Sequence, residues 1–468
     1  MTEFNSTRVN GMVTLSEQLS DFTFNLCYEA LPAEVVEHVR LHALDILGVC
    51  LLGGRMHFAG ILRSTVTACG GVPESTLISS GGLRLPAPLA TVYNGGLAHG
   101  SEFDDTYAQG RWHGSAPTVP PLLAVAEVLH SRGESFITSL TAALEVGCRL
   151  TRAAPGMLNH GFHSTCTAGI FAATLGVGKL MGLSSDEMAN AMGICGSFAS
   201  GTVEFLSDPE PWSKRIQVGY AGQGAIVAAR AARNGFKGPR TILEGRYGYF
   251  RSHAGEGNFD LSGITKDLGS DWQVLYLYPK RYPCDHIAQG YIDCALSLGQ
   301  TEGITSNNIE RVECIVHPLV VPVMFEPKDI RYRPTNGWSA RWSMPFNMAV
   351  ALTDHALTVD SFTDQRANDS NTRDLMAKIT YVQEPSLAFP GDYPAWVRLH
   401  AKDGRVLEHK VLKVAGSPEN PMPAEEYEKK FVNNACRSMD EGRAVEIVKR
   451  MRNLPLLEDI AELARLFG

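Results

Sequence analysis

One stretch of the chain, from Asn94 to His130, combines the residue types that acid–base chemistry requires. It reads NGGLAHGSEFDDTYAQGRWHGSAPTVPPLLAVAEVLH. Its ionisable and hydroxyl side chains are Glu102, Asp104, Asp105, Thr106 and His113. Gly, Ser and Pro surround them, which predicts a loop or helix ends, where catalytic groups concentrate. The alternative is that Asp104 and Asp105 cap the preceding segment and His113 is an ordinary surface residue.

Two Lys-Arg pairs elsewhere supply the cations that this stretch lacks. Lys214-Arg215 precedes an apolar helix, and Lys280-Arg281 begins the run PKRYPCDH, which ends at His286. Lysine provides a point charge and arginine a bidentate fork, so such pairs suit the binding of carboxylates. The alternative for either pair is a solvated side chain or a surface ion pair worth about 0–1 kcal/mol.

Motifs for nucleotides, nucleophilic serine and metal are absent or weak. The chain has no GxxxxGK[ST] or GxSxG, and the GxxGxG at Gly219–Gly224 falls inside a predicted helix, which favours helix packing. His160, His163 and Cys166 have ligand-capable spacing but no evident fourth ligand, so no metal site is expected. These motifs therefore give no support for a nucleotide, a nucleophilic serine or a metal.

Composition and charge narrow the class of protein. The chain has 468 residues, which favours two domains, and a net charge of −8 without a basic run, which argues against nucleic acid as a partner. Ten scattered cysteines without a CxxC pair indicate reduced thiols and a cytoplasmic location. The N-terminal MTEFNSTRVNG has no targeting pattern, and the apolar run Ala43–Leu52 is too short for a membrane span.

The hydrophobic pattern predicts a mainly α protein with a smaller α+β part. Residues 1–270 read as successive apolar helices rich in Ala and Gly, including one opened by the capping box Ser184-x-x-Glu187. Residues 271–413 mix helices with alternating strands, and Asp403-Gly404 predicts a hairpin turn. Residues 414–468 return to helix after a Pro-rich linker, which suggests that this tail rejoins the first domain.

The sequence resembles the MmgE/PrpD family along nearly its whole length. The resemblance rests, in chain order, on NGGLAHGSEFDDT, HGSAPTVPPLLAVAE, GFHSTCTAGIFAATLGVGKLMGLS, WSKRIQVGYAGQGAIVAARAARNGF, PKRYPCDHIAQGYIDCAL, SARWSMPFNMAVAL and FPGDYPAWVRLHAKDGRVL. It implies a large all-helical domain formed by both chain ends, and a smaller α+β lid. It also implies a homodimer and an active site between domain and lid, without metal or organic cofactor.

The resemblance also implies roles for individual residues. The catalytic histidine of the family falls on His113, and the other catalytic candidates are Lys280, Glu102, Asp105 and Thr106. The candidates for substrate binding are Lys214, His163, Arg281, His286 and Tyr332. Lys214 and Lys280 would hold carboxylates, and Glu102 or Asp105 would orient His113. Tyr332 is the nearest match to a lid tyrosine of the family.

Three departures leave the substrate open. The first acid of the DFDDT-like block is Glu102 where decarboxylases usually have Asp, the loop before His113 looks one residue longer, and a second histidine near Gln289 is missing. We expect a lyase acting on a small di- or tricarboxylate, first a 2-methylcitrate-type dehydratase. The alternatives are an iminodisuccinate-like epimerase or a cis-aconitate-like decarboxylase with the same acid–base groups, and a non-catalytic binding protein of the same fold.

Overall fold

The computed structural model describes residues 13–208 and 212–468, so the N-terminal MTEFNSTRVNG lies outside the described residues. The described chain is mainly helical with few strands, which confirms the expected class. No helix in these two ranges combines the length and apolar character that crossing a membrane requires.

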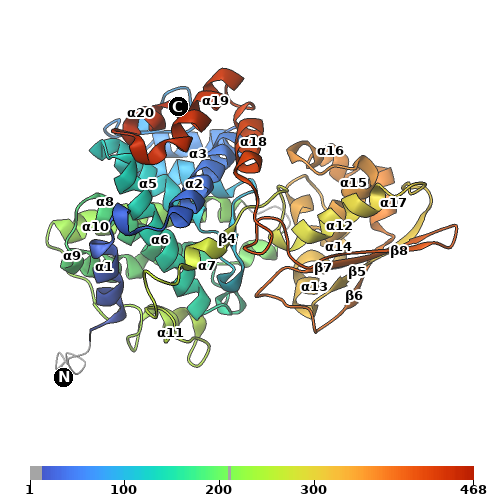
Figure 1. Cartoon of the computed structure of the whole chain (residues 1–468), viewed down its shortest axis with the longest axis horizontal. Helices are drawn as coiled ribbons and strands as arrows, with labels where there is room; N and C mark the ends of the chain where they lie inside the picture. The colour runs from blue at the N-terminus through green and yellow to red at the C-terminus, as the bar shows by residue number, and fades with distance from the viewer. Residues whose placement is uncertain (1–12, 209–211) are drawn as a thin grey trace.

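The first part of the chain is a bundle of helices (Figure 1). Its α-helices are α1 (Leu15–Asn25), α2 (Ala33–Gly53), α3 (His57–Thr67), α4 (Ala87–His99), α5 (Ser115–Leu129), α6 (Gly133–Ala153), α7 (Ser164–Thr167), α8 (Gly169–Leu180), α9 (Ser185–Cys195), α10 (Ser213–Arg233) and α11 (Tyr249–Ala254). The Ser184–Glu187 capping box opens α9 as expected. Gly235, with φ +90°, follows the end of α10. At such a φ glycine avoids the steric cost of a Cβ.

Small residues bring α10 and α4 into close contact. A Cβ on Gly219 would lie 2.3 Å from the carbonyl oxygen of Val92, and one on Gly95 would lie 2.7 Å from the Cα of Gly219. The GxxGxG run therefore serves helix packing, as its position in a predicted helix indicated. This contact fixes Lys214, in the first turn of α10, beside the end of α4, where the acid-rich loop begins.

The C-terminal helices return to the N-terminal bundle. They are α18 (Ala424–Ala435), α19 (Glu441–Arg452) and α20 (Ile460–Ala464). α18 and α19 pack on α2, and α20 packs on α5 (Figure 1). Apolar side chains of this tail, such as Phe431 and Ile447, belong to the same buried core as those of α2 and α5.

Residues between these two helical segments form a second, separate core. Its helices are α12 (Gln289–Gly299), α13 (Val321–Met324), α14 (Lys328–Arg331), α15 (Met344–Asp354), α16 (Asp364–Ala367) and α17 (Ser370–Met376). Its strands are β5 (Ile309–Val316), β6 (Ile379–Gln383), β7 (Ala395–Ala401) and β8 (Val406–Val411). The sheet order is β6-β5-β7-β8, with β5 and β6 parallel and the other pairs antiparallel. The hairpin predicted at Asp403-Gly404 joins β7 to β8.

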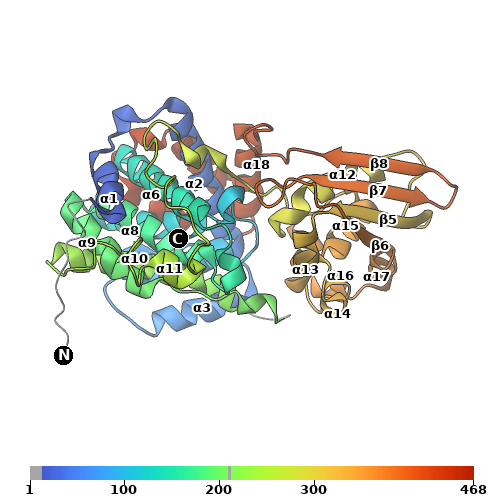
Figure 2. The same cartoon turned by 90° about the horizontal axis from the view of Figure 1, so that it is seen from below.

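One face of this sheet is covered by helices (Figure 2). α12 packs on β7 and β8, and α15 packs on β6 and α12. Side chains of β7 alternate between buried and half-buried, because successive residues of a strand point to opposite faces. The strands themselves lie away from the helical bundle, and loops at the near side of the sheet face it (Figures 1 and 2).

Two short β-ladders connect loops, and one of them positions residues of the candidate site. β1 (Ser75–Thr76) pairs with β2 (Arg84–Leu85). β3 (Thr106–Tyr107), in the acid-rich loop, pairs antiparallel with β4 (Leu277–Tyr278). Thr106 lies opposite Tyr278, so the ladder places Lys280 next to residues that precede it by more than 170 positions.

Candidate active site

The acid-rich loop follows α4 directly and is buried. Glu102, Asp104, Asp105 and Thr106 each have side chains with almost no exposure. Glu102 has φ +56°, in the left-handed region that costs a non-glycine residue roughly 1–2 kcal/mol. A strained, buried loop of charged residues is typical of a functional site, where surrounding contacts hold the conformation.

His113 is oriented by the backbone of this loop. Its Nδ1 lies 2.6 Å from the carbonyl oxygen of Asp105 and 3.2 Å from Oγ1 of Thr106. A carbonyl only accepts hydrogen bonds, so Nδ1 carries the proton and Nε2 keeps its lone pair. Burial lowers the pKa of His113 to about 4, and of the charges around it Asp104 opposes that change while Lys280 adds to it. The free site thus holds a neutral imidazole that can accept a proton.

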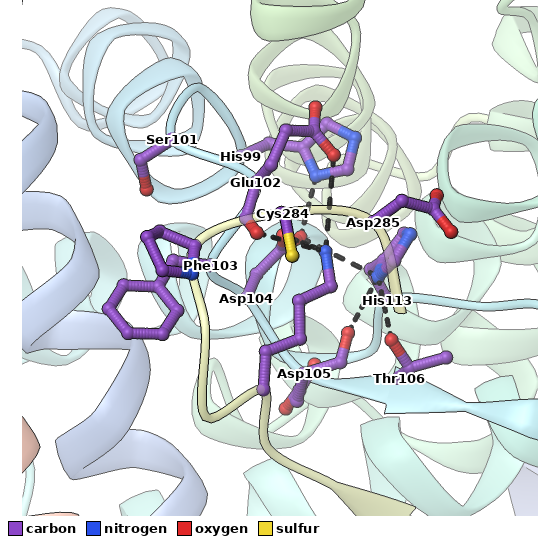
Figure 3. Close-up of polar contacts among 12 residues, drawn as sticks. His99, Ser101, Glu102, Phe103, Asp104, Asp105, Thr106, His113, Cys284 and Asp285 are labelled. Carbon is purple, nitrogen blue, oxygen red and sulfur yellow. Dashed lines mark hydrogen bonds and ion pairs between the residues drawn. The ribbon is translucent and has the colours of Figure 1, made fainter. Parts of the chain in front are cut away.

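A second histidine lies behind His113. Nδ1 of His99, the last residue of α4, is 2.6 Å from Oδ2 of Asp104. The His99 ring centroid lies 5.3 Å from the ring centroids of both His113 and His163. Burial raises the pKa of Asp104, but His99, His113 and Lys280 outweigh it and hold that pKa well below its usual range. Asp104 is therefore a carboxylate between the imidazoles of His99 and His113 (Figure 3). Lys280 lies 3.6 Å from its Oδ1.

Both predicted lysines meet this loop. Nζ of Lys214 lies 2.5 Å from Oε1 of Glu102. Nζ of Lys280 donates to the carbonyl oxygen of Glu102 at 3.2 Å and lies 3.6 Å from Oδ1 of Asp104. Burial lowers the pKa of Lys280, but Asp104 and Glu102 outweigh it and raise that pKa. Two buried cations thus match two buried carboxylates.

The side chain of Asp105 does not orient His113, which corrects that expectation. Its Oδ2 accepts from Nδ1 of His42 at 2.8 Å, and its carboxylate also accepts from the backbone N–H of Ser115, at 3.1 Å, and from the Ser115 hydroxyl. Only the Asp105 carbonyl faces His113. Glu102 likewise pairs with Lys214 and makes no hydrogen bond to His113. The Asp105 carboxylate instead fixes the loop to α2 and to the start of α5.

Replacing Asp105 by asparagine should therefore act on stability. The amide loses the charge-assisted bonds to His42 and Ser115, which are worth about 1.5–3 kcal/mol of unfolding free energy. Urea unfolding measures the loss, and Asp392→Asn is a matched control, because Asp392 pairs with Lys413 near the surface and should cost about 0–1 kcal/mol. Equal losses in the two variants would contradict a structural role for the Asp105 carboxylate.

A cavity of about 270 Å³ opens beside these groups. Residues of the helical bundle on its lining are Thr106, Arg111, His113, Leu158, Asn159, His163, Phe205, Leu206 and Lys214. Residues of the α+β part are Asp285, His286, Ile287, Leu319, Pro322, Val323, Trp342, Phe389 and Tyr393. The cavity therefore lies where the two parts meet, and it combines apolar surface with His113 and Lys214.

Two further predicted residues lie on this cavity. Nδ1 of His163 is 2.9 Å from Oε1 of Gln217, and burial places the pKa of His163 well below its usual value. His286 packs between the rings of Tyr278 and Tyr393. Burial, then Lys280, lowers the His286 pKa well below its usual value. Both histidines are neutral groups suited to hydrogen bonding with a ligand.

Two other predicted residues lie elsewhere. The Tyr332 hydroxyl donates to the carbonyl oxygen of Ile379 at 2.9 Å, and the ring packs on the core of the α+β part. Arg281 points to the outer side, 3.3 Å from Asp293 and 3.8 Å from Glu426. Neither lines the cavity. Tyr332 is turned into the core of the α+β part, and Arg281 faces the opposite side of its loop from Lys280.

The structure adds residues to which the sequence analysis assigned no role in the site. His99 and Asp104 form the buried pair behind His113, Trp342 lies 4.6 Å from Nζ of Lys214, and Tyr393 and Arg111 line the cavity. His99 and Arg111 both stand within the quoted stretch, so their closeness to the acids was a usable signal. Trp342 and Tyr393 follow it by more than 200 residues, and only the tertiary fold brings them near.

Within residues 13–208 and 212–468, no three His, Cys, Asp or Glu side chains are arranged to hold a metal ion. Of the three residues with ligand-capable spacing, Cys166 has its Sγ 3.4 Å from Nδ1 of His163, while His160 bonds to Asn258.

Comparison with protein families agrees with the sequence resemblance. The family model of the MmgE/PrpD N-terminal domain matches residues 17–262, and that of the C-terminal domain matches residues 282–454. The chain belongs to the MmgE/PrpD family. As an enzyme of this family it contains both characteristic regions, and the cavity lies between residues contributed by each.

Several curated members of the MmgE/PrpD family match over nearly their full length. Cis-aconitate decarboxylase of Aspergillus terreus is 25% identical over 482 residues, which cover 98% of this chain and 97% of the relative. Cis-aconitate decarboxylase-like protein oryM of Aspergillus oryzae is 25% identical over 477 residues, covering 97% of each. Human cis-aconitate decarboxylase is 23% identical over 475 residues, covering 97% of this chain and 94% of the relative.

Proposed function

We propose that this protein is a lyase that decarboxylates a small tricarboxylate of the cis-aconitate type. The observation that carries the proposal is a neutral, oriented His113 beside buried cations in a partly apolar cavity. The relatives support this alternative over the 2-methylcitrate-type dehydratase that we expected first, since the similar curated proteins are named decarboxylases. The epimerase has no comparable support.

The proposed reaction breaks one C–C bond and forms one C–H bond. The electron pair of the bond to the leaving carboxylate stays with the carbon skeleton, CO2 departs, and one proton is added to carbon. His113 takes up this proton on Nε2 when the substrate binds and then delivers it to carbon, since Nδ1 stays engaged by the Asp105 carbonyl. A tricarboxylate and one proton thus give a dicarboxylate and CO2.

Lys214 would hold a carboxylate that remains on the product. Its ammonium has three donors, of which Glu102 takes one. The side chain of Lys214 is almost unexposed, and the ring centroid of Trp342 lies 4.6 Å from Nζ. In such a site a positioned donor stabilises charge that develops on carboxylate oxygens, and losing one costs about 3–4 kcal/mol in the transition state. Lys280 stabilises this arrangement, because its positive charge compensates the carboxylates of Glu102 and Asp104.

Binding of the substrate should be accompanied by proton uptake. The pKa of His113 is about 4 in the free site, so the ring is neutral near neutral pH. Nearby substrate carboxylates favour the charged ring and raise this pKa. Between about 4 and the raised value the complex binds more protons than the free protein, so affinity increases as pH falls. Calorimetry at about pH 6 in buffers of different ionisation enthalpy should show uptake of a fraction of one proton.

The His113→Gln variant is the control for this measurement. It keeps a polar side chain of similar reach but has no group that titrates in this window. Uptake of the same size in the variant, or no dependence on the buffer in the wild type, would contradict the role of His113.

The reaction type is tested by NMR of the purified protein with cis-aconitate in D2O. Decarboxylation gives CO2 and a product with deuterium on carbon at the site of protonation. Loss of water from 2-methylcitrate would support the dehydratase, and C–H exchange without a change in composition would support an epimerase. Tight binding of tricarboxylates without any of these reactions would support a binding protein of this fold.

The same proposal includes a division into two domains. One domain consists of residues 1–270 and 414–468, and the other of residues 271–413. The proposal also includes a homodimer and a cytoplasmic location. The tail packing on α2 and α5 and the second core support the division. Light scattering on the purified chain tests the dimer.

A further inference from the structure

Arg111 is the cation on the cavity that the proposed chemistry has not used. It lines the cavity together with His113 and Lys214. Its guanidinium carbon lies 5.7 Å from the ring centroid of Phe389, a residue of the α+β part. Arg111 Nε is buried and has no hydrogen-bond partner, and within the described ranges no carboxylate forms an ion pair with this side chain. An unpaired guanidinium at a cavity is suited to an anionic ligand.

The charges around the cavity make this arginine decisive. Glu102 matches Lys214, and Asp104 with Glu102 surrounds Lys280. The two carboxylates thus offset the two lysines, while burial keeps His113 and His163 neutral. Arg215 and Arg341 also interact with Glu102 but do not line the cavity, whereas the carboxyl group of Asp285 does. On the lining itself, a ligand with several carboxylates therefore meets a Lys214 that is already paired with Glu102. Arg111 supplies a full positive charge with a fork that binds a carboxylate through two parallel hydrogen bonds.

The backbone holds Arg111 in place before a ligand arrives. The residue ends the 3-10 helix η2 (Ala108–Gly110) with φ 48° and ψ 48°, a left-handed conformation. Its N–H donates to the carbonyl oxygen of Ala108 at 3.1 Å, and its own carbonyl accepts from the Ser164 hydroxyl at 2.9 Å. An isolated antiparallel β-bridge between Tyr107 and Trp112 closes the turn that contains Arg111. Preorganisation of this kind reduces the entropy lost on binding.

From these contacts we infer that Arg111 is a specificity-determining residue that binds a second carboxylate of the substrate, distant from the one on Lys214. The inference rests on the proposed function for the identity of the reaction. The preference for a second carboxylate is a property of the cavity and is measured by binding alone. It predicts that the protein selects polycarboxylates over ligands in which one carboxylate is replaced by a neutral group of the same shape. Arg111 acts in binding and does not move a proton.

The test uses a matched pair of unreactive ligands, propane-1,2,3-tricarboxylate and the monoamide of one terminal carboxylate. By calorimetry the wild type should bind the triacid at least about tenfold more tightly than the monoamide, because a charged fork prefers a carboxylate. In Arg111→Gln this preference should fall to about twofold or less. Arg111→Lys, which keeps the charge without the fork, should be intermediate.

Arg132→Gln is the matched control, because Arg132 forms an exposed ion pair with Glu458 far from the cavity lining. It should retain the wild-type preference. A preference that persists in Arg111→Gln, or a wild type that binds neither ligand, would overturn the inference.

Turnover separates this inference from the proposed function. With an active wild type, Arg111→Gln should raise KM about tenfold or more and change kcat much less, since the lost contact is made in the ground state and the transition state alike. If the wild type has no decarboxylase activity but shows an Arg111-dependent preference for the triacid, the decarboxylase proposal fails and the inference stands.

Discussion

His113→Ala is expected to lower kcat by about 10²- to 10⁴-fold, the usual contribution of a positioned general acid or base. The imidazole is the group whose orientation is fixed by the Asp105 carbonyl and the Thr106 hydroxyl while it faces the cavity. Because alanine leaves a small void near the surface of the cavity, the fold should persist. Turnover of cis-aconitate followed by NMR measures the activity, and circular dichroism with thermal unfolding measures the fold.

A matched control is His130→Ala, since His130 is exposed and pairs with Asp459 at the end of α5. That variant should keep its activity within about twofold and lose about 0–1 kcal/mol of stability. Activity of His113→Ala within tenfold of the wild type would remove His113 from the mechanism. Residual activity restored by added imidazole would place the defect at the proton transfer itself.

Lys280→Met is expected to be the most destabilising single replacement at the site. Lys280 is fully buried and provides positive charge to both Glu102 and Asp104. Methionine has a similar shape but leaves two carboxylates with less compensation, and breaking a buried ion pair in this way costs about 3–5 kcal/mol of unfolding free energy. Activity should also be lost, because the loop that carries Glu102 and Asp104 rearranges or takes up protons.

The pH dependence distinguishes this cause from a simple loss of packing. The pKa values of Glu102 and Asp104 are lowered in the folded protein, so their contribution to stability is present above about pH 4 and is lost as pH falls through the lowered values. Without Lys280 both acids bind protons at higher pH. The stability difference between wild type and Lys280→Met should therefore shrink as pH falls from about 7 toward 4.

Denaturant unfolding across this pH range measures the difference. Lys237→Met is the control, because Lys237 is exposed and lies 3.9 Å from Asp186, and it should cost about 0–1 kcal/mol. A loss in Lys280→Met that stays constant with pH would show that the packing of the lysine stem, and not its charge, stabilises the loop.

The contacts in this site give a physical explanation for the glutamate at position 102, where the resemblance leads one to expect aspartate. Glutamate is one methylene longer than the aspartate usual at this position, and its Oε1 reaches Nζ of Lys214. The pairing offsets the charge of the lysine that we propose to bind a substrate carboxylate. An arginine at 111, on the loop that looks one residue longer, restores positive charge to the cavity. We propose that the two departures act together on substrate choice.

The sequence by itself determined the helical class, a few local features such as one helix start and one hairpin turn, and the candidate groups for acid–base chemistry. These follow from local signals, such as the Ser184 capping box, the Asp403-Gly404 turn and the apolar periodicity of the bundle. They require only neighbouring residues, so the linear chain records them. His113, Thr106 and the acids lie close together along the chain, so their clustering is also visible in the sequence.

Only the tertiary structure decided which way each side chain points. The carbonyl of Asp105, not its carboxylate, orients His113, since the carboxylate is engaged by His42 from α2. Lys280 turns toward Glu102 while Arg281, its neighbour, turns outward, because the β3–β4 ladder fixes the loop at that register. Long-range ladders and packing set these directions, and residue spacing along the chain contains no record of them.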